Sequence, residues 1–125
     1  MTTAPKVSIG LAVRNGEEYM ASAIDSILAQ SYGDFELIIS DNASTDRTEE
    51  IARDFVARDG RVRYHRNAIN IGGANNENQT VAMARGHYFR WAAHDDRLAP
   101  EMLAKSVAVL ENAPDVVLCY SDVVE

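Results

Sequence analysis

The sequence predicts an α/β protein built on a mostly parallel sheet with helices on both faces. Short apolar runs alternate with longer stretches in which apolar residues recur with the period of a helix. No low-complexity segment, linker or long block of charge interrupts this alternation. The length of 125 residues is typical of one domain. Alternating strands and helices imply parallel strands joined by right-handed crossovers, so we expect a single domain of this class.

Five segments have the composition of strands. The first, Val7–Val13, is rich in apolar and β-branched residues and carries no charge, which predicts a buried strand. Phe35–Ser40 is the second expected strand, and the alternating segment Arg61–His65 is a third, more exposed one. His87–Ala92 and Val116–Ser121 are the fourth and fifth.

Four helices are expected between these strands. Glu17–Gln30 places its apolar residues on one face. A second helix starts at about Asp46, which has capping-box spacing to Glu49. Ala74–Arg85 forms a third helix. Pro100–Glu111 forms the fourth, with proline at a favourable first position.

Composition excludes several classes of function. The net charge of −7 argues against a nucleic-acid partner, because phosphate backbones favour clustered Lys and Arg. The single cysteine, Cys119, excludes an internal disulfide and a cysteine-based zinc site, and we expect it to be a small core residue. No apolar run is long enough to span a membrane, and residues 1–6 do not resemble a signal peptide. We therefore expect a cytoplasmic protein.

Polar residues gather where three of the expected strands end. Arg14 follows the first strand, Asp41 and Asn42 follow the second, and Asp95 and Asp96 follow the fourth. In parallel α/β sheets, ligands bind beyond the carboxyl ends of the strands. If the strand order is 3-2-1-4, the three clusters meet in one crevice.

Asp95 and Asp96 are the strongest candidates for chemistry. Adjacent carboxylates repel each other, and a divalent cation such as Mg²⁺ relieves that repulsion while keeping substrate phosphates as further ligands. The alternative is a solvated acidic turn before a helix. Asp41 and Asn42 likewise allow two interpretations, recognition of a base or ribose, or membership of a helix-capping loop. Neither a GxGxxG motif after the first strand nor a P-loop motif occurs, so a diphosphate would need a metal to neutralise it.

Four stretches resemble glycosyltransferase family 2, in order and with similar spacing. They are Val7–Tyr19, Ser26–Asp46, Asn70–Gly86 and His94–Leu103, the last being similar to the family's Asp-x-Asp region. The resemblance covers nearly the whole chain. It implies the N-terminal half of a Rossmann-like GT-A fold and sugar transfer from a nucleotide-sugar donor with inversion. The implied partners are a nucleotide-diphosphate sugar, with a UDP-sugar as first expectation, and a glycan or lipid-linked acceptor.

The resemblance also implies roles for individual residues. Residues expected to contact the nucleotide sugar are Ala12, Val13, Arg14, Asp41, Asn42 and Asp95. The first three would border the nucleoside, and the next two would recognise the base or ribose. Asp95 and Asp96 would hold the ribose and a Mn²⁺ or Mg²⁺ ion that bridges the diphosphate. Two positions depart from the family pattern, since Asn42 and Ala93 stand where the family often has Asp.

Family members usually continue past the length of this chain, and the continuation normally carries the acceptor site and the catalytic base. We therefore expect that residues 1–125 are the donor-binding half of a larger enzyme and that the base lies beyond Glu125. Alone, this half should bind a nucleotide without efficient transfer. An exposed sheet edge would also allow self-association.

Two other classes of protein share some of these features. A phosphoacceptor signalling domain would need an acidic pair after the first strand and a lysine after the fifth, where this chain has Arg14-Asn15 and Ser121-Asp122. The second is a non-catalytic nucleotide-sugar-binding module, which would have the same donor-site residues as the enzyme. Metal-dependent donor binding without turnover is expected of both that module and a donor-binding half.

Overall fold

The computed structural model describes residues 3–121, in which four strands alternate with four helices. The elements in chain order are β1 (Val7–Val13), α1 (Met20–Leu28), β2 (Phe35–Asp41), α2 (Thr48–Arg58), β3 (Val62–Arg66), α3 (Gly73–Met83), β4 (Tyr88–Trp91) and α4 (Met102–Asn112).

The four strands form one parallel sheet in the order β3-β2-β1-β4. This is the order 3-2-1-4 that was assumed for the convergence of the three polar clusters. β1 pairs with β2 over its full length, Val7 opposite Phe35 and Val13 opposite Asp41. β1 therefore lies between β2 and β4, and the ends of these three strands are neighbours.

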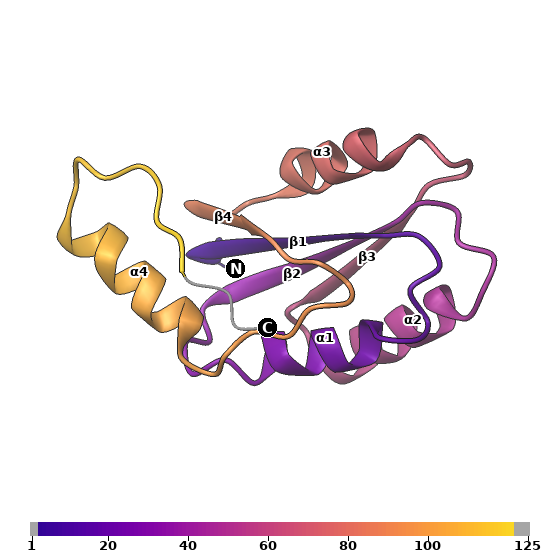
Figure 1. Cartoon of the computed structure of the whole chain (residues 1–125), viewed down its shortest axis with the longest axis horizontal. Coiled ribbons are helices and arrows are strands. Elements are labelled where there is room, and N and C mark those ends of the chain that lie inside the picture. The colour runs from indigo at the N-terminus through magenta and orange to yellow at the C-terminus, as the bar shows by residue number, and fades with distance from the viewer. Residues whose placement is uncertain (1–2, 122–125) are drawn as a thin grey trace.

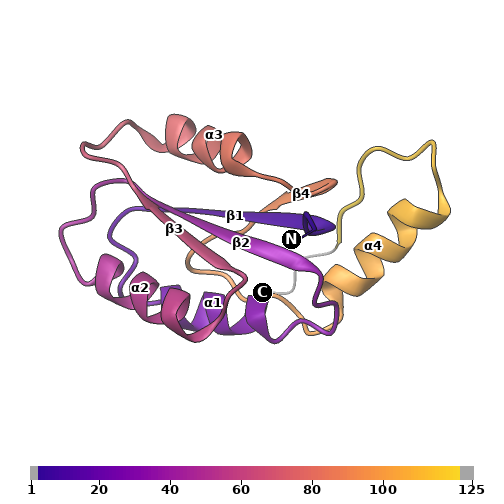
Figure 2. The same ribbon diagram turned by 180° about the vertical axis from the view of Figure 1, so that it is seen from behind.

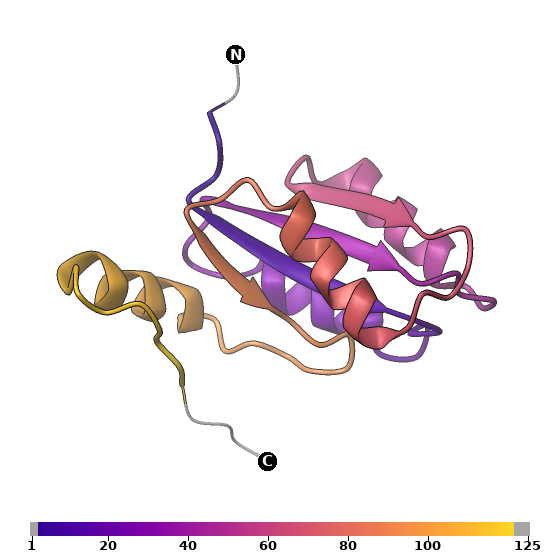
Figure 3. The same ribbon diagram turned by 90° about the horizontal axis from the view of Figure 1, so that it is seen from above.

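Helices cover both faces of the sheet, as the sequence predicted. α3 lies over one face, and α1 and α2 lie over the other (Figure 1 and Figure 2). α4 lies beside the N-terminal ends of the strands rather than over the sheet (Figure 3). It is attached there by an ion pair between Lys6 and Glu111 and by two buried apolar residues, Leu103 and Val107.

The main core lies between the sheet and helices α1 and α2. β2 is buried along its whole length, and β1 is buried except at Ala12. α1 contributes one apolar face, with Met20, Ile24 and Ile27 almost fully buried. The two central strands expose no charge and α1 is amphipathic. These features are therefore sufficient to explain why the sheet and the helix form two packed layers.

α1 and α2 begin at Met20 and Thr48, later than the predicted Glu17 and Asp46. The backbone N–H groups of Gly16 and Glu17 donate to the side chains of Thr48 and Asp46 and so join the two loops before these helices. Asp46 also accepts the N–H of Thr48 at 2.9 Å and its hydroxyl at 2.6 Å, in the turn before α2. The predicted capping box is wrong, because the N-cap of α2 is Arg47 without a side-chain cap bond, and Glu49 pairs with Arg53.

The predicted fifth strand over Val116–Ser121 is wrong. These residues form no pairing with the sheet, and the side chains of Val117 and Leu118 are 95% and 76% exposed. The segment follows α4 and pairs with none of the described strands, so its apolar composition alone does not make a strand. Cys119 is half-buried and does not belong to the core that was expected to contain it.

Within residues 3–121, no helix combines the length and apolar character needed to cross a bilayer.

Candidate functional site

The loops that follow β1 and β2 are bonded together into one unit. The Arg14 guanidinium donates to the backbone carbonyls of Asn42 and Ala43, both at 2.8 Å. The backbone N–H of Asn15 donates to Ser44, and the Asn15 side chain accepts the N–H of Thr45 at 2.8 Å. Arg14 was a candidate to meet a ligand, and in this structure its guanidinium holds the shape of the neighbouring loop.

Asp41 is a fully buried anchor at the end of β2, with 0% exposure. One carboxylate oxygen accepts the N–H of Ser44, and the other accepts the Tyr64 hydroxyl at 2.6 Å and Arg66 at 3.1 Å. Burial and then the hydrogen bond to Asp41 raise the pKa of Tyr64 well above its usual value, so the phenol remains a donor. Three of the roughly four lone-pair sites of this carboxylate are used internally.

Asn42 connects the β2 end to the loop before α3. It is 3% exposed, and its side-chain oxygen accepts from Asn67 at 3.1 Å and from the backbone of Ile71 at 2.9 Å. Its amide group donates to Asn70 at 2.7 Å. These bonds give Asn42 a structural role in that loop. The sequence did not suggest this role, because it depends on contacts 25 or more residues away along the chain.

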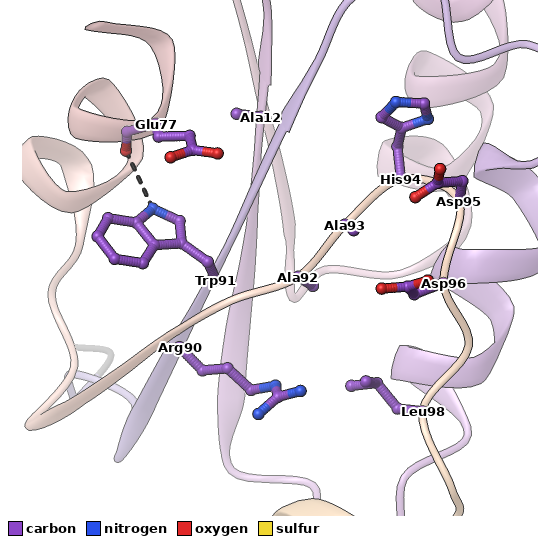
Figure 4. A pocket seen from close by; sticks show the side chains of 10 residues that line it. All are labelled: Ala12, Glu77, Arg90, Trp91, Ala92, Ala93, His94, Asp95, Asp96 and Leu98. Carbon is purple, nitrogen blue, oxygen red and sulfur yellow. Dashed lines mark hydrogen bonds between the residues drawn. The ribbon is translucent and has the colours of Figure 1, made fainter. Parts of the chain in front are cut away.

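A pocket of about 430 Å³ lies beside the ends of β1 and β4 (Figure 4). Its lining consists of Ala12, Glu77, Arg90, Trp91, Ala92, Ala93, His94, Asp95, Asp96 and Leu98. Of the predicted binding residues, the pocket brings together Ala12, Asp95 and Asp96. Val13 is buried, and Arg14, Asp41 and Asn42 do not line the pocket but stabilise the loops next to it.

Two nitrogen atoms at the pocket wall have no hydrogen-bond partner among the described residues. They are Nε of Arg90 and Nδ1 of His94, and both are buried. Burial lowers the pKa of Arg90 from its ordinary value. A buried polar atom without a partner costs free energy, so these two nitrogens are unsatisfied in this structure.

Glu77 is a residue of this site that the sequence did not suggest. It lies on α3, and Figure 4 shows its carboxylate directed into the space between Trp91 and Ala12. Nothing in the local sequence marks it, because α3 is polar over much of its surface. Contact between α3 and the end of β4, which is a tertiary feature, brings Glu77 to the pocket.

The acidic pair fits a divalent cation whose coordination a ligand completes. Figure 4 shows the carboxylate of Asp96 directed from the loop into the pocket, with Asp95 next to it. In the part of the chain that the structure describes, no group of three His, Cys, Asp or Glu side chains could hold a metal by itself. Carboxylate oxygens suit Mn²⁺ or Mg²⁺, and Mg²⁺ usually binds one or two carboxylates together with substrate phosphates.

Comparison with known proteins identifies relatives of this chain. It is 39% identical over 112 residues to EpsE of Bacillus subtilis, named as a glycosyltransferase, and covers 40% of that protein. That alignment includes 89% of this chain. It is 34% identical over 119 residues to the uncharacterized glycosyltransferase MJ1057 of Methanocaldococcus jannaschii, covering 94% of this chain and 41% of that protein. The chain thus spans about two-fifths of the length of these relatives.

Solved structures share the fold. S. aureus TarS 1–349, solved in complex with UDP-GlcNAc, superposes with a TM-score of 0.80 at 24% identity, covering 86% of this chain and 31% of that one. The mannosyltransferase PcManGT from Pyrobaculum calidifontis, solved with GDP-Man and Mn²⁺, gives a TM-score of 0.78 at 24% identity. It covers 87% of this chain, which in turn spans 33% of that protein. At these identities the structures establish a GT-A-like arrangement of the sheet and helices.

The model of the family described as glycosyl transferase family 2 matches residues 8–124, which is nearly the whole chain. The family is the one that the sequence resembles at its strand ends and its acidic pair. The chain therefore belongs to glycosyl transferase family 2.

Proposed function

We propose that this chain binds the donor in an inverting glycosyltransferase, which transfers a sugar from a nucleoside diphosphate to an acceptor hydroxyl. The observation that carries the proposal is the pocket of about 430 Å³ in which Asp95 and Asp96 stand beside the end of β1. In open α/β sheets this is the edge where ligands bind. Membership of the family supports sugar transfer as the reaction.

The donor is proposed to be a nucleotide-diphosphate sugar, with a UDP-sugar as the first choice. TarS was solved with UDP-GlcNAc and PcManGT with GDP-Man, so two proteins of this fold bind ligands of this class. Their bases differ, and Asn42 stands at a position where the family often has Asp. The base is therefore a question for direct titration.

Asp95 and Asp96 are proposed to hold Mn²⁺ or Mg²⁺ against the diphosphate. Such an ion, when bound, offsets the negative charge that develops on the departing nucleoside diphosphate. The contribution of the chain is to place two carboxylates on one short loop after β4. Ala92 and Ala93 precede them in the lining, and their small side chains leave room for a ligand.

Ala12, Val13 and Arg14 are proposed to border the nucleoside through the end of β1. Arg14 supports this surface by fixing the carbonyls of the next loop, so the loop is ordered before a ligand arrives. Base or ribose recognition by Asp41 and Asn42 stays a prediction. Asp41 has 0% exposure, so a ligand would reach its carboxylate after local rearrangement.

The acceptor is proposed to be a glycan or a lipid-linked sugar, in the synthesis of a polysaccharide or cell-wall polymer. We assign no catalytic base among residues 3–121. That the base lies beyond Glu125, and that the protein is cytoplasmic, stay predictions from the sequence.

Calorimetric titration tests the proposal. UDP, GDP and dTDP are titrated into the chain with and without Mn²⁺, and the titrations are repeated on Asp95→Ala and Asp96→Ala. We expect one nucleotide to bind in a metal-dependent manner and each variant to weaken that binding more than tenfold, about 1.4 kcal/mol. The reason is that each variant removes one of two carboxylates that hold the ion.

Asp115→Ala is the matched control, because Asp115 is an exposed carboxylate in the turn after α4 and outside the pocket. It should bind like the parent chain. Absence of binding by any nucleotide to a sample with a cooperative unfolding transition would contradict the proposal, and so would equal affinities in the presence and absence of metal.

A further inference from the structure

Trp91 presents a fixed aromatic surface to the pocket. Its side chain lies at the end of β4, is 49% exposed, and lines the pocket together with the acidic pair. The indole N–H donates to the backbone carbonyl of Glu77 and to the hydroxyl of Thr80, both at 3.2 Å. The ring also meets Phe89 edge-on, with centroids 5.2 Å apart. The ring is therefore held on one side by α3 and β4 while its other side is open.

The sequence allows this arrangement through Gly10 on β1. A Cβ at that position would lie 2.4 Å from the Thr80 hydroxyl and 2.8 Å from the Phe89 ring. Glycine at position 10 thus lets α3 and β4 pack closely against β1. Thr80 on α3 and Phe89 on β4, which both hold the indole, lie at this contact. An exposed tryptophan held in one orientation is more consistent with a binding surface than with incidental exposure.

The Glu77 carboxylate stands beside this ring. Figure 4 shows it directed into the pocket from α3, on the side of Trp91 that faces Ala12. Within residues 3–121 the carboxylate forms neither a hydrogen bond nor an ion pair, and the bonds to Glu77 are made by its backbone. The carboxylate is therefore an available acceptor of hydrogen bonds.

This pair of groups matches the chemistry of a pyranose ring. One face of such a ring carries C–H groups, which pack on an aromatic surface, while its edge carries hydroxyls, which donate to a carboxylate in charge-assisted hydrogen bonds. A diphosphate would instead be repelled by Glu77. The carboxylate thus suits the neutral part of a ligand, whereas Asp95 and Asp96 suit the part that brings a cation.

We infer that Glu77 and Trp91 form a subsite for a neutral sugar ring, with Trp91 as the platform and Glu77 as the hydroxyl acceptor. The inference rests on the proposed function and extends it to specificity. A sugar that carries its own carboxylate, such as glucuronic acid, would face Glu77 and be disfavoured. The sugar is either the one carried by the donor or one of the acceptor, and these two sources give different results in the test.

Trp91 is the one tryptophan of the chain, so its fluorescence reports this subsite directly. With Mn²⁺ present, emission and affinity are measured for UDP, for UDP-GlcNAc, and for UDP together with free GlcNAc or chitobiose. If GDP is the preferred nucleotide, GDP, GDP-mannose and free mannose or mannobiose are used. A change produced by the nucleotide sugar but not by the nucleotide assigns the subsite to the donor sugar. A change produced by the free saccharide in the presence of the nucleotide assigns it to an acceptor sugar.

Variants separate sugar recognition from nucleotide binding. Glu77→Gln and Trp91→Ala should lower the affinity for the responding sugar about tenfold, while binding of the nucleotide alone changes less than twofold. Glu77→Gln should also reduce the discrimination against UDP-glucuronate relative to UDP-glucose. Trp91→Phe keeps an aromatic face and should retain part of the sugar affinity, and it serves if Trp91→Ala does not fold. Glu101→Gln, an exposed acid outside the pocket, should behave like the parent chain.

The inference is overturned if the nucleotide binds but neither saccharide form alters Trp91 emission, or if Glu77→Gln leaves both sugar affinity and discrimination unchanged. If no nucleotide binds to the folded chain, that result contradicts the proposed function, and the subsite, which rests on it, is contradicted as well. The two failures are distinguishable because nucleotide binding is measured by calorimetry on the same samples.

Discussion

A single buried carboxylate, Glu36, joins three strands at the end of the sheet opposite the pocket. It is 2% exposed and accepts from Ser8 on β1 at 2.6 Å and from Arg63 on β3 at 2.8 Å. It also accepts from the backbone and the side chain of Arg85, just before β4. Burial alone would raise the pKa of Glu36, but these hydrogen bonds outweigh burial, so the pKa is lowered from its ordinary value near 4.5.

This shift gives a prediction about stability and pH. A lowered pKa in the folded state means that the ionised Glu36 contributes stability above about pH 4.5, and the contribution is lost as the pH falls through the folded-state value. Glu36→Gln should therefore lower the free energy of unfolding by about 1–3 kcal/mol at pH 7. Urea unfolding across pH 7 to 3 should show the gap between parent and variant narrowing on acidification. A gap that stays constant or widens would contradict this account.

Burial separates Asp41 and Glu36 from Asp95 and Asp96. The first two are buried and bonded to partners inside the chain, whereas the second two are exposed on the pocket loop. Carboxylates whose bonds are made internally organise the fold, and the exposed pair is the one that we propose to bind a ligand. Sequence alone presents all four as acidic residues on a strand or just after one.

At the scale of elements, Gly10 determines how closely α3 and β4 pack on β1. A Cβ there would lie 2.4 Å from Oγ1 and 2.7 Å from Cβ of Thr80, which is 0% exposed. Separations below 3 Å require one of the elements to shift. The position of the Trp91 ring depends on the same contact, because Thr80 accepts the indole N–H.

We therefore predict that Gly10→Ala destabilises the chain by about 1–3 kcal/mol, the usual cost of overpacking, and shifts the emission of Trp91. Thermal unfolding and intrinsic fluorescence measure the two effects. Gly60→Ala is the matched control, since nothing lies within 4 Å of a Cβ added there. Equal stability of Gly10→Ala and Gly60→Ala would show that the Gly10 contact is not restrictive.

At the scale of the whole molecule, an apolar segment and a sheet edge are both left open. Val117, Leu118 and Tyr120 are 95%, 76% and 85% exposed, and β4 has β1 as its partner on one side while the described residues pair nothing with the other. Exposed apolar runs and unpaired strand edges favour association. The self-association expected from the sequence stays a prediction on these grounds.

Sedimentation analysis tests that prediction. The chain should show a weight-average mass that rises with concentration, and Val117→Lys combined with Leu118→Lys should lower it, because charge disfavours the burial of that segment. Val56→Lys is a control, since Val56 is a partly exposed apolar residue on α2, away from the segment. A monomeric mass at all concentrations would contradict the prediction.

The sequence by itself determined the layers and the location of the site. Strand composition and helical period depend on neighbours in the chain, so the four paired strands, their helices and the acidic residues after β4 were all predictable. The order β3-β2-β1-β4 was assumed from the sequence, and the structure confirms the assumption. Residues such as Asp95 and Asp96 also predicted the family, and the family match confirms that prediction.

The tertiary structure decided which residues face the pocket and which segments become strands. Asp41 and Asn42 are bound to partners 23 to 29 residues away, and Glu77 reaches the pocket because α3 packs beside the end of β4. Val116–Ser121 has the composition of a strand, but it pairs with no described strand and is largely exposed. The composition of a segment indicates its preferred secondary structure, whereas strand pairing and burial depend on which surfaces of the protein meet. Long-range contacts decide which surfaces meet, and a local sequence pattern carries no information about those contacts.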